Sequence, residues 1–237
     1  MLPQLLHKLF RFVVPHVCPY CRQELADDEA LLCPECVSLM PQLPERLCPC
    51  CGGPNDGFLA ACPDCTRADE ARPWLRAVSA FPFYGHLREA VHHFKYHRRI
   101  SLAPYLAKHM LQAWREHSDG VPVDLVSYIP LHWWRIWRRG YNQAAVLASL
   151  IAKQLHIPVA TTLRRRKYTS QQAKLDRVQR AQNVKNAFRP HRPALFQERN
   201  ILLVDDVFTT GATLTAAAKT ILSAGAASVS VLTIARD

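Results

Sequence analysis

Three features that would point directly to a location or a function are missing from this sequence. No run of 18 apolar residues occurs, so we expect no membrane span. The apolar first 18 residues are interrupted by Lys8, Arg11 and Pro15, and no small-residue cleavage pattern follows. We therefore predict no signal peptide and expect the protein in the cytoplasm. The Gly-x-x-x-x-Gly-Lys pattern of P-loop nucleotide-binding proteins is also missing.

Acidic residues are almost missing from one long segment. Residues 135–192 contain 14 lysines and arginines but only one acidic residue, in a chain whose net charge is +11. This segment alone supplies more than the whole positive excess. A solvated basic face is one explanation. The size of the imbalance favours the other, a site for phosphates or nucleic acid.

Eight of the nine cysteines form four Cys-x-x-Cys pairs. The pairs are Cys18 and Cys21, Cys33 and Cys36, Cys48 and Cys51, and Cys62 and Cys65. The spacing lets both thiolates of a pair reach one metal ion, and two pairs complete a tetrahedral site. Since nothing directs the chain to an oxidising compartment, we predict structural zinc rather than disulfides.

The sequence leaves the pairing of these motifs open. Pairing in sequence order gives two zinc ribbons within residues 1–70, whereas interleaved pairing gives a cross-brace, so we expect one or two zinc ions. We favour two ribbons because each closes a short loop, with Cys50 outside the metal sites. Such closed sites have no open position for a substrate. The module would therefore contribute folding energy or a docking surface.

A second domain is predicted over residues 71–237, where strands and helices alternate. The expected strands are 77–84, 124–129, 200–205 and 228–235. The expected helices are 87–96, 101–117, 143–155 and 212–224. Alternation with nearly continuous apolar strands predicts an α/β fold with a parallel sheet flanked by helices.

The strongest motif follows the third predicted strand. There Asp205 and Asp206 precede a loop of residues 209–213, called here the Thr/Gly loop, and a helix begins near Ala212. Ligands bind at the carboxyl ends of strands in open α/β sheets. The backbone N–H groups of the loop and helix suit a phosphate, Gly211 permits close approach, and adjacent carboxylates suit ribose hydroxyls. Simple capping of the strand and helix is the alternative, but it needs fewer of these residues.

The segment VDDVFTTGAT resembles the phosphoribosyl pyrophosphate (PRPP) signature of type I phosphoribosyltransferases. Together with the four cysteine pairs, HHFKYHRR at 92–99 and RRGYNQ at 138–143 make the whole chain resemble the ComF family, including GntX-type proteins. The resemblance implies a type I phosphoribosyltransferase-like fold after a double zinc ribbon. It also implies a competence-related role in DNA uptake or utilisation.

The same resemblance implies roles for individual residues. Asp205 and Asp206 would bind the ribose hydroxyls, and the Thr/Gly loop would bind the 5′-phosphate. The implied PRPP-binding set is Asp205, Asp206, Val207, Phe208, Thr209, Thr210, Gly211, Ala212, Thr213, Pro130, Leu131, His132, Arg135 and Arg138. Asp205, Asp206 and Arg139 would be catalytic, and Mg²⁺ would accompany PRPP.

Further candidates surround this set. A mobile loop at about 164–182 would close over the substrate and bring Lys167, Arg177 and Arg180 to it. Residues 141–143 would shape the same wall, although Asn142 also suits a helix cap. Lys95 is a candidate as well, but an exposed lysine on an amphipathic helix explains it equally.

Two functions remain open at this point. One is phosphoribosyl transfer to an acceptor that the sequence does not identify. The other is binding of single-stranded DNA or the DNA-uptake machinery, with a PRPP pocket that senses without turnover. Trp133, Trp134 and Trp137, interleaved with Arg135 and Arg138, suit base stacking between phosphate contacts. We favour the plainer interpretation, in which the tryptophans pack against the sheet.

Overall fold

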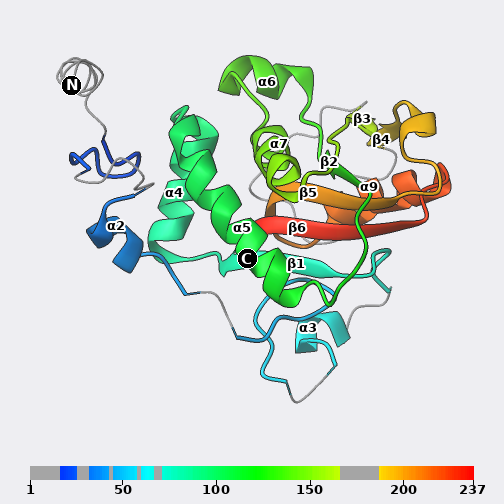
Figure 1. Ribbon diagram of the computed structural model, residues 1–237, viewed down its shortest axis with the longest axis horizontal. Helices are drawn as coiled ribbons and strands as arrows, with labels where there is room; N and C mark the ends of the chain where they lie inside the picture. The colour runs from blue at the N-terminus through cyan, green and yellow to red at the C-terminus, as the bar shows by residue number, and fades with distance from the viewer. Residues whose placement is uncertain (1–16, 26–31, 43–44, 58–59, 67–70, 166–186) are drawn as a thin grey trace, which may run out of the picture.

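The computed structural model describes residues 17–25, 32–42, 45–57, 60–66, 71–165 and 187–237 (Figure 1). Its helices are α2 (Pro34–Ser38), α3 (Pro63–Thr66), α4 (Gly85–Tyr96), η1 (Ile100–Leu102), α5 (Ala103–His117), α6 (Trp133–Arg139), α7 (Gln143–Leu155), η2 (Pro193–Leu195) and α9 (Ala212–Ser223). Its strands are β1 (Ala77–Pro82), β2 (Leu125–Tyr128), β3 (Leu163–Arg165), β4 (Phe188–Pro190), β5 (Asn200–Phe208) and β6 (Ser228–Arg236).

In the described part of the chain, four strands form the central sheet in the order β1-β6-β5-β2, and all neighbours are parallel. The predicted parallel α/β sheet is therefore confirmed. β5 lies between two neighbours and runs on to Phe208, three residues beyond the predicted end, because Asp205 and Val207 still pair with β6. The acidic pair therefore lies in the paired part of β5, near the carboxyl edge of the sheet.

Helices cover both faces of this sheet. Alternate residues of β5 point to opposite faces, so Leu202 and Val204 join the core with α5 and α7, whereas Ile201 and Leu203 join the core with α9. In Figure 1 α5 and α7 lie in front of the sheet, and α5 packs on β1 and β6. The buried sheet explains why its strands are apolar almost throughout.

Sequence periodicity located the long helices closely but missed short elements. α7 has the predicted bounds, and α9 differs by one residue. α6 was not predicted because none of its residues is buried, so it has no core-facing stripe. β3 and β4 form an antiparallel pair of three residues each, too short for a period to be read.

The two cysteine-rich segments are built into the two cores. The first contributes Cys18, Cys33 and Cys36 to the core around α4 and α5, whereas the second contributes Cys48 and Cys51 to the core around α9. In Figure 1 α2 is drawn on the side of the molecule where α4 lies, and α3 is drawn below the sheet, on the β1 side.

The second segment also extends the sheet. Gly52 forms a parallel bridge with Val78, and the Ala77 N–H donates to the Pro49 carbonyl at 2.8 Å. Gly52 has φ +68° and a Cβ there would lie 2.6 Å from the Ser79 nitrogen, so only glycine fits. Among the described helices, none has the length and apolar content needed to cross a membrane.

Candidate functional site

The eight paired cysteines gather into two clusters in sequence order. The first cysteine cluster is Cys18, Cys21, Cys33 and Cys36, and the second is Cys48, Cys51, Cys62 and Cys65. This confirms the pairing into two ribbons and contradicts the cross-brace. Cys50 belongs to neither cluster, as expected.

The geometry of both clusters fits zinc. The sulfurs of Cys21 and Cys33 are 3.6 Å apart, and those of Cys51 and Cys62 are 3.7 Å apart. Four sulfurs placed tetrahedrally at zinc–sulfur distances of about 2.3 Å are separated by about 3.8 Å. A hydrogen bond from the Cys51 thiol lowers the pKa of Cys48 to about 4, which favours the thiolate that binds metal. Four sulfurs leave no open coordination position, so these are structural sites.

The acidic pair lies at the carboxyl end of β5 and is partly buried. The Asp205 carboxylate accepts from the Asp206 N–H at 2.8 Å, and the Asp206 carboxylate accepts from the Val207 N–H at 2.7 Å. Each contact uses the Oδ1 atom of its carboxylate. Both carboxylates therefore lie at the strand end, where the sequence predicts them.

Lys95 reaches this pair from α4. Its ammonium nitrogen lies 2.9 Å from a carboxylate oxygen of Asp206, and both side chains are only 18% exposed. Lys95 is therefore a member of the site and not an exposed lysine on a solvated helix face. Its α4 position, 111 residues from Asp206, explains why sequence reasoning left its role open.

Burial dominates the electrostatics of the pair. Burial and the neighbouring charge of Asp206 raise the pKa of Asp205 to about 7, even though Lys95 and Arg165 act in the opposite direction. Arg165, from β3, feels both Asp205 and Arg135, and burial lowers its pKa to about 10. Arg165 was missed by sequence reasoning because it stood in a run of arginines without a distinguishing spacing.

The Thr/Gly loop leads straight into α9. Gly211 precedes the helix with φ +77°, in the left-handed region that favours glycine. A Cβ at Gly211 would lie 2.7 Å from the Phe208 ring and 3.0 Å from the Arg72 guanidinium. α9 begins directly after this loop, and the N–H of its first residue, Ala212, donates to the Thr210 hydroxyl at 3.4 Å.

Arg72 is a second residue that sequence reasoning missed. It belongs to the linker before β1, yet its guanidinium donates to the Thr210 carbonyl at 3.2 Å and to the Thr215 hydroxyl at 3.4 Å. No local pattern announces such a contact, because more than 130 residues separate the partners.

The loop after β2 lies beside the end of β5. The Ile129 N–H donates to the Val204 carbonyl at 3.0 Å, which places Pro130, Leu131 and His132 at the same sheet edge. His132 caps α6, where its ring accepts from the Trp134 N–H at 3.4 Å. The two loops named in the sequence are thus brought together.

The residues at the end of α6 and the start of α7 connect neighbouring elements. Asn142 caps α7 by accepting from the Ala144 N–H at 3.0 Å, and its amide donates to the Ile129 carbonyl. Arg139 donates to the Tyr96 hydroxyl at 3.1 Å and to Gln143 at 3.2 Å, so it joins α6 to α4. Lys167, Arg177 and Arg180 lie outside the described residues.

The expected packing of the tryptophans is wrong. Trp133 is 68% exposed, Trp137 is 72% exposed and Trp134 is 42% exposed. The rings of Trp134 and Trp137 stack on each other at 5.1 Å. The physical reason is the position of α6, which stands away from the sheet with no buried residue (Figure 1).

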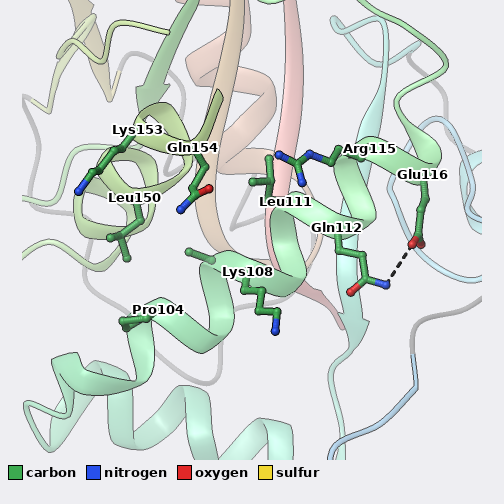
Figure 2. Close-up of a pocket in the computed structure, with 10 residues that line it drawn as sticks. Pro104, Lys108, Leu111, Gln112, Arg115, Glu116, Leu150, Lys153 and Gln154 are labelled. Atoms are coloured by element: carbon green, nitrogen blue, oxygen red, sulfur yellow. Dashed lines mark hydrogen bonds between the residues drawn. The ribbon is translucent and has the colours of Figure 1, made fainter. Parts of the chain in front are cut away.

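Two hollows lie in different parts of the molecule. One of about 760 Å³ lies between α4 and the end of β5 and is lined by residues that include Phe83, Lys95, Tyr96, Val207 and Thr209, so it adjoins the acidic pair. The other, of about 660 Å³, lies between α5 and α7 (Figure 2). Among the described residues its lining comes from those two helices, and it belongs to a different part of the molecule.

Two family models match separate parts of the chain. The model described as a phosphoribosyl transferase domain matches residues 142–237. The model described as a double zinc ribbon domain matches residues 9–66, which include all eight clustered cysteines.

Whole-length relatives were found among characterised proteins. The DNA utilization protein YhgH of Salmonella typhi is 35% identical over 227 residues, covering 94% of this chain and 98% of that protein. Competence protein F of Haemophilus influenzae is 31% identical and covers 92% and 96%. Competence protein ComFC of Bacillus subtilis is 28% identical and covers 90% and 87%.

Solved structures give only distant matches. An adenine phosphoribosyltransferase is 15% identical with a TM-score of 0.38, covering 60% of this chain and 74% of its own. The full-length relatives and the family models, and not these structures, therefore identify the family. With a relative above 30% identity matched over nearly its whole length, the chain belongs to the ComF family of DNA-utilization and competence proteins.

Proposed function

We propose that this protein binds PRPP at the carboxyl ends of β5 and β2 and transfers its phosphoribosyl group to an acceptor still to be identified. One observation carries the proposal: Asp205 and Asp206 adjoin a Thr/Gly loop that opens the N-terminus of α9. Carboxylates suit the ribose hydroxyls, and the loop and helix N–H groups suit the 5′-phosphate. Each kind of group in this arrangement therefore has a matching group on PRPP.

The surrounding cations suit the leaving group. Displacement of pyrophosphate from ribose passes through an oxocarbenium-like transition state, and negative charge grows on the pyrophosphate as the bond breaks. Arg165 lies near enough to Asp205 and Arg135 that both charges act on its pKa: Asp205 raises it and Arg135 lowers it. Preorganised cations there would stabilise that charge. We assign Pro130, Leu131, His132 and Arg138 to the same leaving-group wall.

Magnesium fits the donor set of this site. Mg²⁺ is usually held by substrate phosphates together with one or two carboxylates, and Asp205 and Asp206 are the carboxylates at this strand end. When bound, the ion would neutralise the pyrophosphate. Arg139, 3.1 Å from the Tyr96 hydroxyl, would order the α4 side of the site.

The biological setting follows from the relatives. Their names place them in DNA utilisation and competence, and we propose the same role for this chain, in the cytoplasm. The division into a zinc module of residues 1–70 and a transferase-like domain of residues 71–237 is part of this proposal.

Thermal unfolding with ligand tests the pocket. Millimolar PRPP with Mg²⁺ is expected to raise the unfolding temperature of the wild-type protein. The double variant Asp205→Asn/Asp206→Asn is expected to lose that shift. Asp124→Asn is a matched control, because Asp124 holds the other end of β5 by accepting from Asn200 at 2.7 Å. An unshifted unfolding temperature in the wild-type protein, or a shift retained by the double variant, would refute the pocket. If the wild-type protein does bind PRPP, a screen of bases and amines for pyrophosphate release identifies the acceptor.

A second function is favoured by the exposure of α6. We propose that Trp133 and Trp137, beside the exposed Arg138, stack on bases of single-stranded DNA while the arginines contact phosphates. This surface would link the protein to DNA or to its uptake machinery. Arg138 is assigned to both surfaces, whereas Trp133 and Trp137 are assigned to the DNA surface alone, so substitution of these tryptophans tests this function by itself.

Salt dependence tests the DNA surface. Affinity for a single-stranded oligonucleotide is expected to fall steeply as salt rises, since phosphate contacts release counterions. Trp137→Ala is expected to weaken binding by about tenfold or more, in line with about 1–3 kcal/mol per stacked base. A flat salt response, or an unchanged affinity in Trp137→Ala, would exclude this surface.

A further inference from the structure

The linker between the second cysteine cluster and β1 reaches the Thr/Gly loop through Arg72. One guanidinium nitrogen donates to the Thr210 carbonyl at 3.2 Å, and another lies 3.4 Å from the Thr215 hydroxyl. Thr215 is in the first turn of α9, where its N–H donates to the Gly211 carbonyl at 2.8 Å. A single side chain thus joins the loop to the helix that follows it.

This contact fixes the direction of a loop N–H group. The Thr210 carbonyl and the Gly211 N–H belong to one trans peptide unit, so they point in opposite directions. When Arg72 holds the carbonyl on its own side, the Gly211 N–H must face the other side. Arg72 therefore sets the orientation of a donor that belongs to the proposed phosphate cradle.

The second cysteine cluster in turn holds Arg72. The guanidinium carbon lies 5.8 Å from the ring centroids of both Trp74 and Phe208, within cation–π range. The Trp74 indole N–H donates to the Cys50 carbonyl at 2.8 Å, and Trp74 is only 8% exposed. Cys50 stands between the clustered Cys48 and Cys51, so the path from the cluster to the loop is continuous.

We propose that Arg72 is a positioning residue of the phosphate-binding loop and that the folded second cysteine cluster, through Trp74, keeps it in place. The inference rests on the proposed PRPP site. It makes the second ribbon a supporting part of that site, so that loss of its fold lowers the affinity for PRPP.

Calorimetric titration of Mg-PRPP into paired variants tests this inference. Arg72→Ala is expected to weaken binding about tenfold, the usual worth of a hydrogen bond from a charged group, while zinc content stays at the wild-type level. Arg72→Lys keeps one donor for Thr210 but loses the planar face, so it is expected to recover part of the affinity.

Arg76 supplies the matched control in the same linker. It donates to the His117 carbonyl at 2.7 Å and pairs with Asp119 at 2.7 Å, with no contact to the loop among these interactions. Arg76→Ala is expected to lower the unfolding temperature but leave the PRPP affinity unchanged. Wild-type affinity in Arg72→Ala, or equal losses in both variants, would overturn the positioning role.

Hydrogen exchange keeps this test separate from that of the proposed function. In the free protein, Arg72→Ala is expected to quicken exchange of the Thr215 amide, whereas Arg76→Ala is not. If the wild-type protein fails to bind PRPP, the proposed function fails, and this exchange pattern still decides whether Arg72 orders the loop. Unchanged Thr215 exchange in Arg72→Ala would refute the coupling.

Discussion

At the scale of single residues, the buried carboxylate of Asp205 lowers the stability of the ligand-free protein. Burial raises its pKa to about 7, far above the value near 4 of an unfolded chain. An acid whose pKa is raised by folding contributes its full stabilisation only at pH values below its pKa in the unfolded chain. That contribution is lost as the pH rises through its pKa in the folded protein. The carboxylate is therefore a cost near neutral pH unless a ligand occupies the site.

Asp205→Asn is accordingly expected to be more stable than the wild-type protein, by a margin that grows with pH. Between pH 5.5 and 7.5 the difference in unfolding free energy should widen by about 2 kcal/mol, since the amide does not titrate. Denaturant melts at several pH values measure the margin. A difference that is constant with pH would contradict the raised pKa.

Lys95 raises the stability of the fold, because its ammonium group compensates the charge of Asp206. Lys95→Met is expected to lower the unfolding free energy by about 1–3 kcal/mol, since it leaves a largely buried carboxylate without its cation. Lys108→Met, at an exposed position of α5, is the control and should change stability by less than about 0.5 kcal/mol. Equal effects in both variants would show that the ion pair contributes nothing.

At the scale of elements, the turn from β5 into α9 depends on one glycine. Gly211→Ala is expected to cost about 2–4 kcal/mol, since it adds a clash with the Phe208 ring to the strain of φ +77°. Gly120→Ala has a similar φ of +70° with open space around it, so it should cost only about 1 kcal/mol. Chemical denaturation compares the two, and a cost at Gly211 no larger than at Gly120 would contradict the packed turn.

The helix α6 should behave as an appended surface element. Trp137→Ala is expected to leave the unfolding free energy within about 0.5 kcal/mol of the wild-type value, because the side chain is 72% exposed. A loss above 2 kcal/mol would show that Trp137 packs in a core after all.

At the scale of the whole molecule, the zinc ribbons and the sheet share their cores. Removal of zinc is expected to lower the melting temperature of the entire chain in one transition, since cysteines of each cluster pack in one of the two cores. Metal analysis should find about two zinc ions per chain before chelation. Unfolding of the ribbons alone, with the sheet unaffected, would contradict the shared packing.

Local patterns in the sequence were enough for the long elements and for the motifs within them. Alternation predicted the parallel sheet, Cys-x-x-Cys spacing predicted the clusters, and the acidic pair marked the strand end. Contacts between distant segments were beyond that reach. Lys95 and Arg72 meet the strand end only after folding, and the exposure of Trp137 depends on where α6 stands.

The central claim is that PRPP binds at the carboxyl end of β5, and a crystal structure with Mg-PRPP tests it most directly. The 5′-phosphate is expected on the N–H groups of the Thr/Gly loop, with the ribose hydroxyls on Asp205 and Asp206. PRPP bound elsewhere on the chain, or a site still empty at saturating PRPP, would contradict the claim.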